Sequence, residues 1–249
     1  MSEALLNLEG VHTRIGSYHI LHGVDLEVPA GEVTMLLGRN GAGKTTTLRT
    51  IMGLWPTAQG SVRFDGQAIG GQQRQLATPE IALLGNAYVP ESMGIFSDLT
   101  VRENLLLAAR AARTVDDIDA TRLEWLFAMF PALKKFWLYP AGKLSGGQKQ
   151  MLAIARALVE PRRLLLIDEP SKGLAPSIVN NLIAVLRELK ATDTTVLLVE
   201  QNFAMACALG DRVAVMDDGR VVHRGAMAEM IEDKALQQRL LGLALETHS

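Results

Sequence analysis

A segment near the start of the sequence has the residue types and spacing of a phosphate-binding loop. It reads Gly38-Arg39-Asn40-Gly41-Ala42-Gly43-Lys44-Thr45-Thr46, which fits the pattern of Gly, four residues, Gly-Lys and a hydroxyl residue. An apolar stretch precedes it and a predicted helix follows it, so its N–H groups can converge on phosphate oxygens. We expect Lys44 to reach terminal phosphates and the Thr45 hydroxyl to bind magnesium. The alternative is an ordinary Gly-rich turn between a strand and a helix.

A second segment places two carboxylates at the end of a buried strand. Leu164 to Ile167 are apolar and are followed by Asp168 and Glu169. Two acids beside an apolar run are costly unless they are neutralised or hydrated, so the pair is either an exposed strand end or part of a site. In a phosphate-loop protein the first carboxylate can hold magnesium and the second can act on an attacking water. Together with the phosphate loop, the pair predicts a nucleotide-hydrolysing site.

A third segment opens a helix that is predicted over 148–159. It reads Leu144-Ser145-Gly146-Gly147-Gln148-Lys149-Gln150, and its N–H groups and the Ser145 hydroxyl could meet an anion. The same residues also suit a simple helix cap with Ser145 as the N-cap. The two interpretations are compatible with each other.

A fourth segment is an apolar run, 196–199, that stops at Glu200-Gln201-Asn202. A run this short is typical of a strand covered on both faces, and α/β proteins bind ligands where such strands end. Asn202 is also a good N-cap for a short helix predicted over 203–209. The polar residues are therefore either part of a site or an ordinary loop and helix start.

The rest of the pattern predicts the elements that position these segments. Strand patterns dominate the first third and return after residue 160, whereas helical periodicity dominates 95–144. The predicted strands are 5–13, 20–28, 33–37, 82–89, 164–167, 196–199 and 213–216, with hairpins at Asp65-Gly66 and from Asp217-Asp218-Gly219 into 221–222. The predicted helices are 44–52, 105–112 after a Thr100 and Glu103 capping box, 122–130, 133–137, 148–159, 177–190, 203–209 and 227–245. This alternation predicts an α/β fold with a helical insert.

Composition excludes several classes of protein. Of the 249 residues, 48% are hydrophobic and 21% are charged, which excludes a disordered chain. The formal net charge of −2 indicates no broad basic surface, so we do not expect nucleic acid as a partner. The single cysteine, Cys207, lies among apolar residues and is expected to be a core thiol. No signal peptide and no membrane-spanning helix are predicted.

With these segments in this order, the sequence resembles the ATP-binding cassette (ABC) family over nearly its whole length. The resemblance implies a P-loop ATPase fold with a parallel core sheet, an N-terminal antiparallel β subdomain and a helical subdomain. It divides the single domain, 1–249, into a nucleotide-binding core at 1–94 and 145–249 and a helical part at about 95–144. In this family two cassettes bind ATP head to tail, so a monomer is expected to be nearly inactive.

The resemblance also assigns a role to each segment. The phosphate loop binds ATP and Mg²⁺ within one chain, and Asp168 supports the magnesium. Glu169 is the base that polarises the attacking water. The helix-opening segment is the family signature and contacts the γ-phosphate bound by the partner; its residues are Ser145, Gly146, Gly147 and Gln148.

Four positions depart from the commonest family pattern. Ile15-Gly16 stands where an aromatic residue usually stacks on adenine, and nearby Tyr18 is either its substitute or a surface aromatic. Glu91 replaces a glutamine of the lid loop; it can still bind magnesium but adds negative charge beside the phosphates. Ala175 stands where many members have Asp. Gln201 replaces the switch histidine, and it can make hydrogen bonds near the γ-phosphate or water but cannot carry a proton.

These departures resemble one subgroup, the second ATPase of importers for branched-chain amino acids and related amides or urea. The similar runs are Val89-Pro90-Glu91, the loop at 170–176, Val199-Glu200-Gln201-Asn202 and the start of the helical part at 99–105. The implied partners are a second ATPase, either a sister chain or another copy, two membrane permeases and, indirectly, an external solute-binding protein. The expected location is cytoplasmic, at the inner face of the membrane. Residues 93–96 are either a docking site for a permease helix or core of the helical part.

Other classes of function remain open from the sequence. A homodimeric ATPase of a lipid or polysaccharide exporter fits the length, but such relatives commonly keep the switch histidine that Gln201 replaces. A soluble ABC protein of translation or DNA repair usually has two cassettes or a long coiled-coil insert, and this chain has neither. A small-molecule P-loop kinase would leave the segment at 145–148 unexplained.

Overall fold

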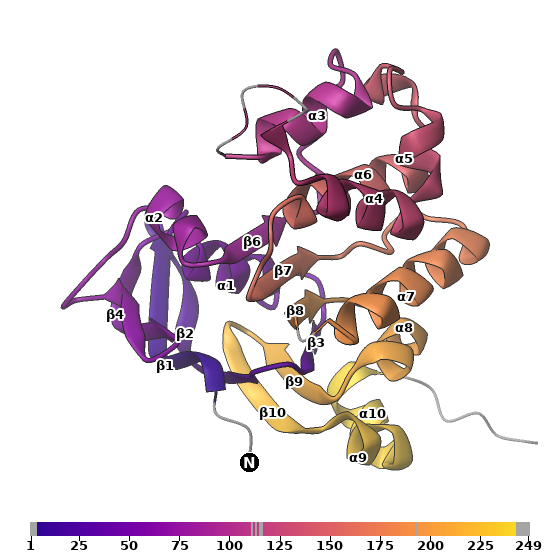
Figure 1. Cartoon of the computed structure of the whole chain (residues 1–249). Helices are drawn as coiled ribbons and strands as arrows, with labels where there is room; N and C mark the ends of the chain where they lie inside the picture. Colours follow the sequence, from indigo (N-terminus) through magenta and orange to yellow (C-terminus); the bar gives the residue numbers. More distant parts are fainter. Residues whose placement is uncertain (1–3, 111, 113, 115–116, 193, 243–249) are drawn as a thin grey trace, which may run out of the picture.

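The computed structural model describes residues 4–110, 112, 114, 117–192 and 194–242. Within them the chain forms an antiparallel sheet at the left of Figure 1, a largely parallel sheet in the middle and a helical region above it. The predicted α/β class, with a parallel core sheet and an N-terminal antiparallel part, is confirmed.

The antiparallel sheet has the order β2-β1-β4-β5. Its strands are β1 (Ala4–Ile15), β2 (Tyr18–Pro29), β4 (Thr57–Phe64) and β5 (Gln67–Gly71). The predicted hairpin at Asp65-Gly66 joins β4 to β5, and both turn residues have positive φ, 51° and 72°, as a two-residue type I′ turn requires.

The central sheet has the order β10-β9-β3-β8-β7-β6. The strands β9, β3, β8, β7 and β6 are parallel to their neighbours, and β10 is an antiparallel edge joined to β9 through Asp218-Gly219. Their bounds are β3 (Val33–Gly38), β6 (Asn86–Val89), β7 (Leu164–Asp168), β8 (Thr195–Val199), β9 (Arg212–Asp217) and β10 (Arg220–Ala226).

Helices cover both faces of the central sheet and build the helical region at the top of Figure 1. Around the core sheet are α1 (Lys44–Ile51), α2 (Thr78–Leu83), α6 (Gly146–Leu158), α7 (Pro176–Lys190), α8 (Phe203–Leu209), α9 (Met227–Glu232) and α10 (Lys234–Leu241). The upper region contains α3 (Val101–Ala108), α4 (Ala120–Met129), α5 (Pro131–Lys135) and a 3₁₀ turn (Ala141–Lys143).

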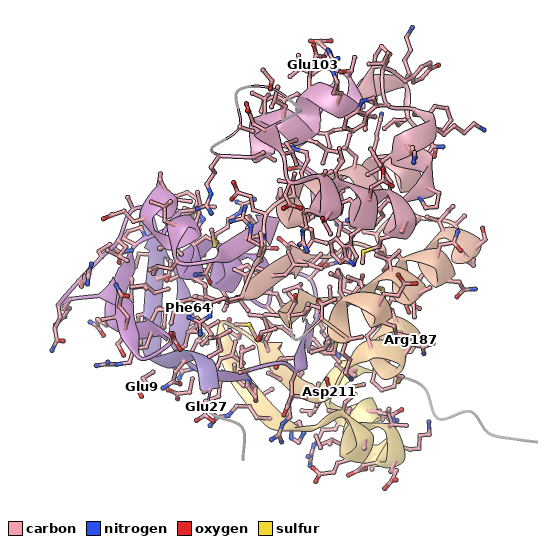
Figure 2. The ribbon with its side chains drawn as sticks, viewed as in Figure 1. Glu9, Glu27, Phe64, Glu103, Arg187 and Asp211 are labelled. Carbon is pink, nitrogen blue, oxygen red and sulfur yellow. The ribbon has the colours of Figure 1, made fainter. Side chains whose placement is uncertain are left out.

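Two hydrophobic clusters lie on opposite faces of the central sheet. In β3, Met35 and Leu37 belong to the cluster shared with α6, α7 and the helical region, whereas Leu36 belongs to the cluster shared with α1 and the antiparallel sheet. Successive residues of a strand point to opposite faces, so both faces of β3 are buried. Phe64, labelled within the left-hand layer in Figure 2, is one of the largest fully buried side chains of the second cluster.

Three predicted elements were wrong in their bounds. The strand predicted over 82–89 begins only at Asn86, as β6, because Pro79 and the Glu80 cap on the Ala77 N–H start a helix, α2, that runs from Thr78 to Leu83. The helix predicted over 105–112 starts directly after its Thr100 cap and ends at Ala108, where the Arg110 N–H instead bonds Glu160.

The predicted tail helix over 227–245 is interrupted. Asp233 leaves the helical conformation and its side chain accepts a hydrogen bond from the Leu236 N–H at 2.8 Å, which caps a new helix, α10. Residues 243–245 of that prediction lie outside the described residues. No helix in the described part of the chain has the length and apolar character needed to cross a bilayer.

Candidate functional site

The phosphate-loop segment connects the end of β3 to the start of α1. Gly38 has φ 145°, and a Cβ built there would lie 2.3 Å from the Met216 carbonyl oxygen on the neighbouring strand. Gly43 has φ 101° and is the N-cap of α1. A side chain at either position would strain the backbone, so both glycines are needed for the loop to turn directly into the helix.

Lys44 is folded back over this loop. It is only 4% exposed, and its Nζ donates to the carbonyl oxygens of Gly38 at 2.9 Å and Arg39 at 3.0 Å. The same Nζ lies 3.7 Å from Glu169 Oε1. Burial lowers the pKa of Lys44, and the nearby Glu169 and Asp168 carboxylates oppose that shift. The result is a buried ammonium group beside the acidic pair, with its donors directed at the loop.

Asp168 ends β7 and is almost fully buried. Its Oδ1 accepts a hydrogen bond from the Thr45 hydroxyl at 3.1 Å, and its Oδ2 accepts one from the Tyr88 hydroxyl at 3.2 Å. Burial raises the pKa of Asp168, and the neighbouring carboxylates Glu169 and Glu91 raise it further. The structure thus brings together two of the three predicted magnesium ligands, Thr45 and Asp168, whose hard oxygens suit Mg²⁺.

Glu169 has a strained backbone. Its φ is 46°, in the left-handed region that a non-glycine residue rarely adopts. The Glu169 N–H bonds the Val199 carbonyl at 2.9 Å on the neighbouring strand β8. Strain of this kind persists only where surrounding contacts fix it, and it is concentrated at functional sites.

Gln201 links the phosphate loop to the acidic pair. β8 lies parallel to β7 with Asp168 opposite Val199, so the residues after Val199 emerge beside Glu169. The Gln201 Nε2 donates to Asn40 Oδ1 and to Glu169 Oε1, each at 2.7 Å. Asn202 caps α8 as predicted, accepting from the Met205 N–H at 3.1 Å. The polar strand end therefore belongs to the site and also starts a helix.

Other residues of the phosphate loop make backbone hydrogen bonds within the loop and to the neighbouring β9–β10 turn. The Ala42 N–H bonds the Arg39 carbonyl at 3.2 Å, and the Ala42 carbonyl accepts from the Gly219 N–H at 3.0 Å, which ties the loop to the β9–β10 turn. Gly41 has φ 83°, and the Thr46 carbonyl accepts from the Thr50 hydroxyl at 2.8 Å.

Glu91 is half-exposed at the start of the lid loop, residues 90–100, which joins β6 to α3. Its Oε1 lies 2.5 Å from Lys172 Nζ, and Lys172 Nζ also lies 3.6 Å from Glu169 Oε2. Glu91 is therefore connected to the acidic pair through a lysine, rather than directly to Thr45 or Asp168.

Other predicted residues lie outside this cluster. Ser145 and Gln148 form a capping box at the start of α6, with the Ser145 N–H bonding Gln148 Oε1 at 2.9 Å. Within the described part of the chain, no hydrogen bond or ion pair of the signature, 145–148, reaches the phosphate loop. Gly146 is exposed and Gly147 is buried against Ile178. Tyr18 is 74% exposed at the β1–β2 turn.

Three further residues contact the site; the sequence assigned no role to Tyr88 or Lys172, and it left Glu200 open between a site and an ordinary loop. Tyr88 contacts Asp168, and burial with that carboxylate raises the pKa of Tyr88 to about 12. Glu200 is 2% exposed, and its carboxylate accepts N–H bonds from Ser171 at 2.9 Å, Gln201 at 3.0 Å and Asn202 at 3.1 Å. Lys172 pairs with Glu91. Only Glu200 gave a sequence signal, as a polar residue directly after an apolar strand; Tyr88 lies within β6, and Lys172 follows the end of β7 by four residues.

Comparison with known proteins places these features in a family. The family model described as "ABC transporter" matches residues 21–172. The high-affinity branched-chain amino acid transport ATP-binding protein BraG of Pseudomonas aeruginosa is 39% identical over 238 residues, covering 96% of this chain and 100% of its own. The probable branched-chain amino acid transport ATP-binding protein LivF of Archaeoglobus fulgidus is 37% identical, covering 90% and 93%.

Solved structures are similar over the same length. A crystal structure of the ADP conformation of an ATP-binding cassette of an ABC transporter has a TM-score of 0.81 at 26% identity, covering 97% of this chain and 98% of that one. An ATP-binding subunit of an ABC transporter has a TM-score of 0.77 at 29% identity, covering 96% of each chain.

Proposed function

This chain belongs to the ABC transporter ATP-binding family, and from that membership we propose that it is the ATP-hydrolysing subunit of an importer for branched-chain amino acids or related small amides or urea. It is an ATP hydrolase of the ABC transport type. The two relatives described above are named as branched-chain amino acid transport ATP-binding proteins, and this supports the proposed solute class.

The observation that carries the proposal is the convergence of three chain segments around Glu169. The phosphate loop contributes Lys44 and Asn40, strand β7 contributes Asp168 and Glu169, and strand β8 contributes Gln201. Because these segments are far apart in the sequence, only the fold brings a phosphate-binding lysine, a magnesium-type carboxylate and a second carboxylate into one site. This set supports hydrolysis of a nucleoside triphosphate.

We propose that Thr45 and Asp168 hold magnesium and that the phosphate loop, Gly38 to Thr46, binds ATP. When bound, Mg²⁺ neutralises negative charge on the phosphates and so assists their transfer to water. Glu91 of the lid loop is a further proposed ligand of magnesium, and Tyr18 is the proposed contact for the adenine base. Lys44 would exchange its two carbonyl partners for phosphate oxygens, which are stronger acceptors for an ammonium group.

Glu169 then acts as the general base that orients and polarises the attacking water. Its carboxylate is anchored by Gln201 Nε2 at 2.7 Å and faces Lys44 at 3.7 Å. Gln201 cannot take up a proton, so its proposed role is to hold the base and Asn40 of the phosphate loop in register. A positioned base typically contributes about 10²–10⁴-fold to the rate.

We propose that the signature residues Ser145, Gly146, Gly147 and Gln148 complete the site of a second ATPase subunit. Their own hydrogen bonds form a helix cap rather than reach the phosphate loop of the same chain, which supports a contact with another chain. The core at 1–94 and 145–249 and the helical part at 95–144 are the two proposed units of the domain. The other proposed partners are two permeases and, through them, an external solute-binding protein, at the inner face of the membrane.

Purification of the tagged chain from native membranes tests the proposal. We expect two permease chains and an ATPase to co-purify, and we expect the complex to hydrolyse ATP faster when a branched-chain amino acid and its binding protein are supplied. A chain carrying the change Glu169→Gln should co-purify with the same partners without hydrolysis. Recovery of ribosomal or DNA-bound partners alone, or of an exporter that responds to lipid, would contradict the importer function.

A further inference from the structure

Negative charge accumulates where the lid loop meets the end of β7. Glu91 follows β6, Asp168 and Glu169 follow β7, and the two strands are parallel neighbours, with Val89 opposite Ile167. The position of Glu91 therefore brings a third carboxylate to the acidic pair. A bound nucleotide would bring further negative charge to the same place.

Lys172 lies between two of these carboxylates. Its Nζ is 2.5 Å from Glu91 Oε1 and 3.6 Å from Glu169 Oε2. A turn fixes its backbone, because the Lys172 N–H bonds the Glu169 carbonyl at 3.2 Å. The lysine thus joins the lid loop to the loop after β7, two segments that no other ion pair connects among the described residues.

Glu169 is held by two lysines on different oxygens. Lys44 faces Oε1 at 3.7 Å, and Lys172 faces Oε2 at 3.6 Å. The proposed function assigns Lys44 to the terminal phosphates, and this inference rests on that assignment. Once Lys44 contacts phosphate, Lys172 is the cation that still faces both Glu169 and Glu91.

We propose that Lys172 is a positioning residue for ATP hydrolysis that compensates the charge of Glu91 and holds the lid loop beside Glu169. A lid-loop glutamate is tolerated next to the phosphates because this lysine neutralises it. The effect of removing Lys172 should therefore be largest while residue 91 is an acid and smaller when residue 91 is an uncharged amide, because Lys172 then faces Glu169 alone.

A double-mutant cycle tests the pair. The variants are Lys172→Met, Glu91→Gln and both together, with Lys172→Arg as the conservative change. The first measurement is ATP affinity of the purified full chain in EDTA, so that no magnesium enters. We expect Lys172→Met to weaken binding about two- to fivefold, the range for exposed charge pairs. The same change in the Glu91→Gln background should have at most half that effect.

The second measurement is ATP turnover by the assembled complex. Lys172→Met should lower kcat more than it changes KM for ATP, and Lys172→Arg should restore most of the loss. The control is Lys134→Met, which breaks another exposed ion pair, Lys134 to Glu124 at 3.6 Å, in the helical region. We expect the control to match the wild-type protein in both measurements.

The outcomes separate this inference from the proposed function. Equal effects of Lys172→Met with and without the Glu91→Gln change would overturn the pairing, as would a change in thermal stability without a change in ATP affinity. A wild-type complex that binds and hydrolyses no ATP would reject the proposed function itself. Wild-type hydrolysis with an unaffected Lys172→Met variant would reject only the role of Lys172.

Discussion

Glu169 combines a strained backbone with two hydrogen bonds and an ion pair that hold it in place. Its left-handed φ of 46° costs about 1–2 kcal/mol, and the Val199 carbonyl, Gln201 and Lys44 hold the residue in that conformation. The strain turns the carboxylate away from the strand direction and toward the phosphate loop. A base that is fixed before substrate arrives needs less reorganisation during the reaction.

The first prediction compares Glu169→Gln with Gln201→Ala in the assembled complex. Glu169→Gln removes the proposed base, so we expect ATP turnover to fall about 10²–10⁴-fold. Gln201→Ala removes two hydrogen bonds that position the base and Asn40, so the loss should be roughly tenfold or less.

Steady-state phosphate release measures both variants. The exposed Gln73 provides a control, since Gln73→Ala changes the same side chain on the surface away from the site. A larger loss for Gln201→Ala than for Glu169→Gln would reverse the two roles.

At the scale of single elements, the start of α3 is fixed by a reciprocal cap. Glu103 Oε2 accepts from the Thr100 N–H at 2.8 Å, and Thr100 Oγ1 accepts from the Glu103 N–H at 3.2 Å. Figure 2 labels Glu103 at the top of the helical region. The capping box was visible in the sequence, but the helix begins directly after Thr100 because a cap must adjoin the first helical turn.

The second prediction is that Thr100→Ala destabilises the protein by about 0.5–2 kcal/mol, the usual effect of losing an N-cap side chain. Urea unfolding followed by far-UV circular dichroism measures the change. Thr121→Ala is the matched control, because Thr121 lies exposed in the first turn of α4 and Asp119, rather than Thr121, caps that helix. Equal losses for the two variants would contradict the capping role.

The third prediction concerns pH. The Thr100 hydroxyl and N–H bonds lower the pKa of Glu103 below its ordinary value of 4.5. The stabilisation is therefore fully present above that value and is lost as pH falls through the lowered folded-state pKa. We expect the stability difference between the wild-type protein and Glu103→Ala to narrow on acidification from about pH 6 to about pH 3.

Urea titrations at several pH values measure that difference. Glu188→Ala, at an exposed helix position without a side-chain hydrogen bond in the described structure, is the control for removing a glutamate that caps no helix. A difference that grows on acidification would contradict the sign of the pKa shift.

At the scale of the whole molecule, a groove separates the helical region from the sheet layers. Its lining includes Leu54, Trp55, Met93, Gly94, Ala153 and Arg156. Phe96 stands beside it, 49% exposed, with the Arg156 guanidinium 5.0 Å from its ring centroid. Met93 and Ile95 pack partly against the core, so the segment at 93–96 contributes to the core and also presents an apolar ring at the surface.

The fourth prediction is that Phe96→Ala lowers solute transport while ATP binding by the ATPase pair survives. The reason is that Phe96 offers exposed apolar area beside the groove where we propose that a permease helix docks. Uptake of radiolabelled solute into cells and nucleotide binding by the purified complex measure the two effects. Leu138→Ala, at an exposed apolar position outside the groove lining, is the control. Unchanged transport in Phe96→Ala would reject the docking site.

A phosphate-binding loop and an acidic pair could be predicted from the sequence alone. Their residue types and spacing are local, and local patterns such as a Gly-rich turn before a helix survive in any fold that contains them. The α/β class also followed from alternating strand and helix patterns. The bounds of α2 and α10 did not, because the proline at the start of α2 and the Asp233 cap of α10 override apolar periodicity over a few residues.

The contacts between residues from distant segments follow from the tertiary structure and could not be predicted from the sequence. The order β8-β7-β6 places Gln201, Glu169 and Glu91 along one sheet edge, and side-chain directions then put Lys172 on Glu91 and Tyr88 on Asp168. Ion pairs and hydrogen bonds of this kind depend on distances between segments that are far apart in the chain; Asn40 and Gln201, for example, are 161 positions apart. The sequence supplies the hydrogen-bond donors and acceptors and the charged groups. The packing of the strands determines which of them form hydrogen bonds and ion pairs with one another.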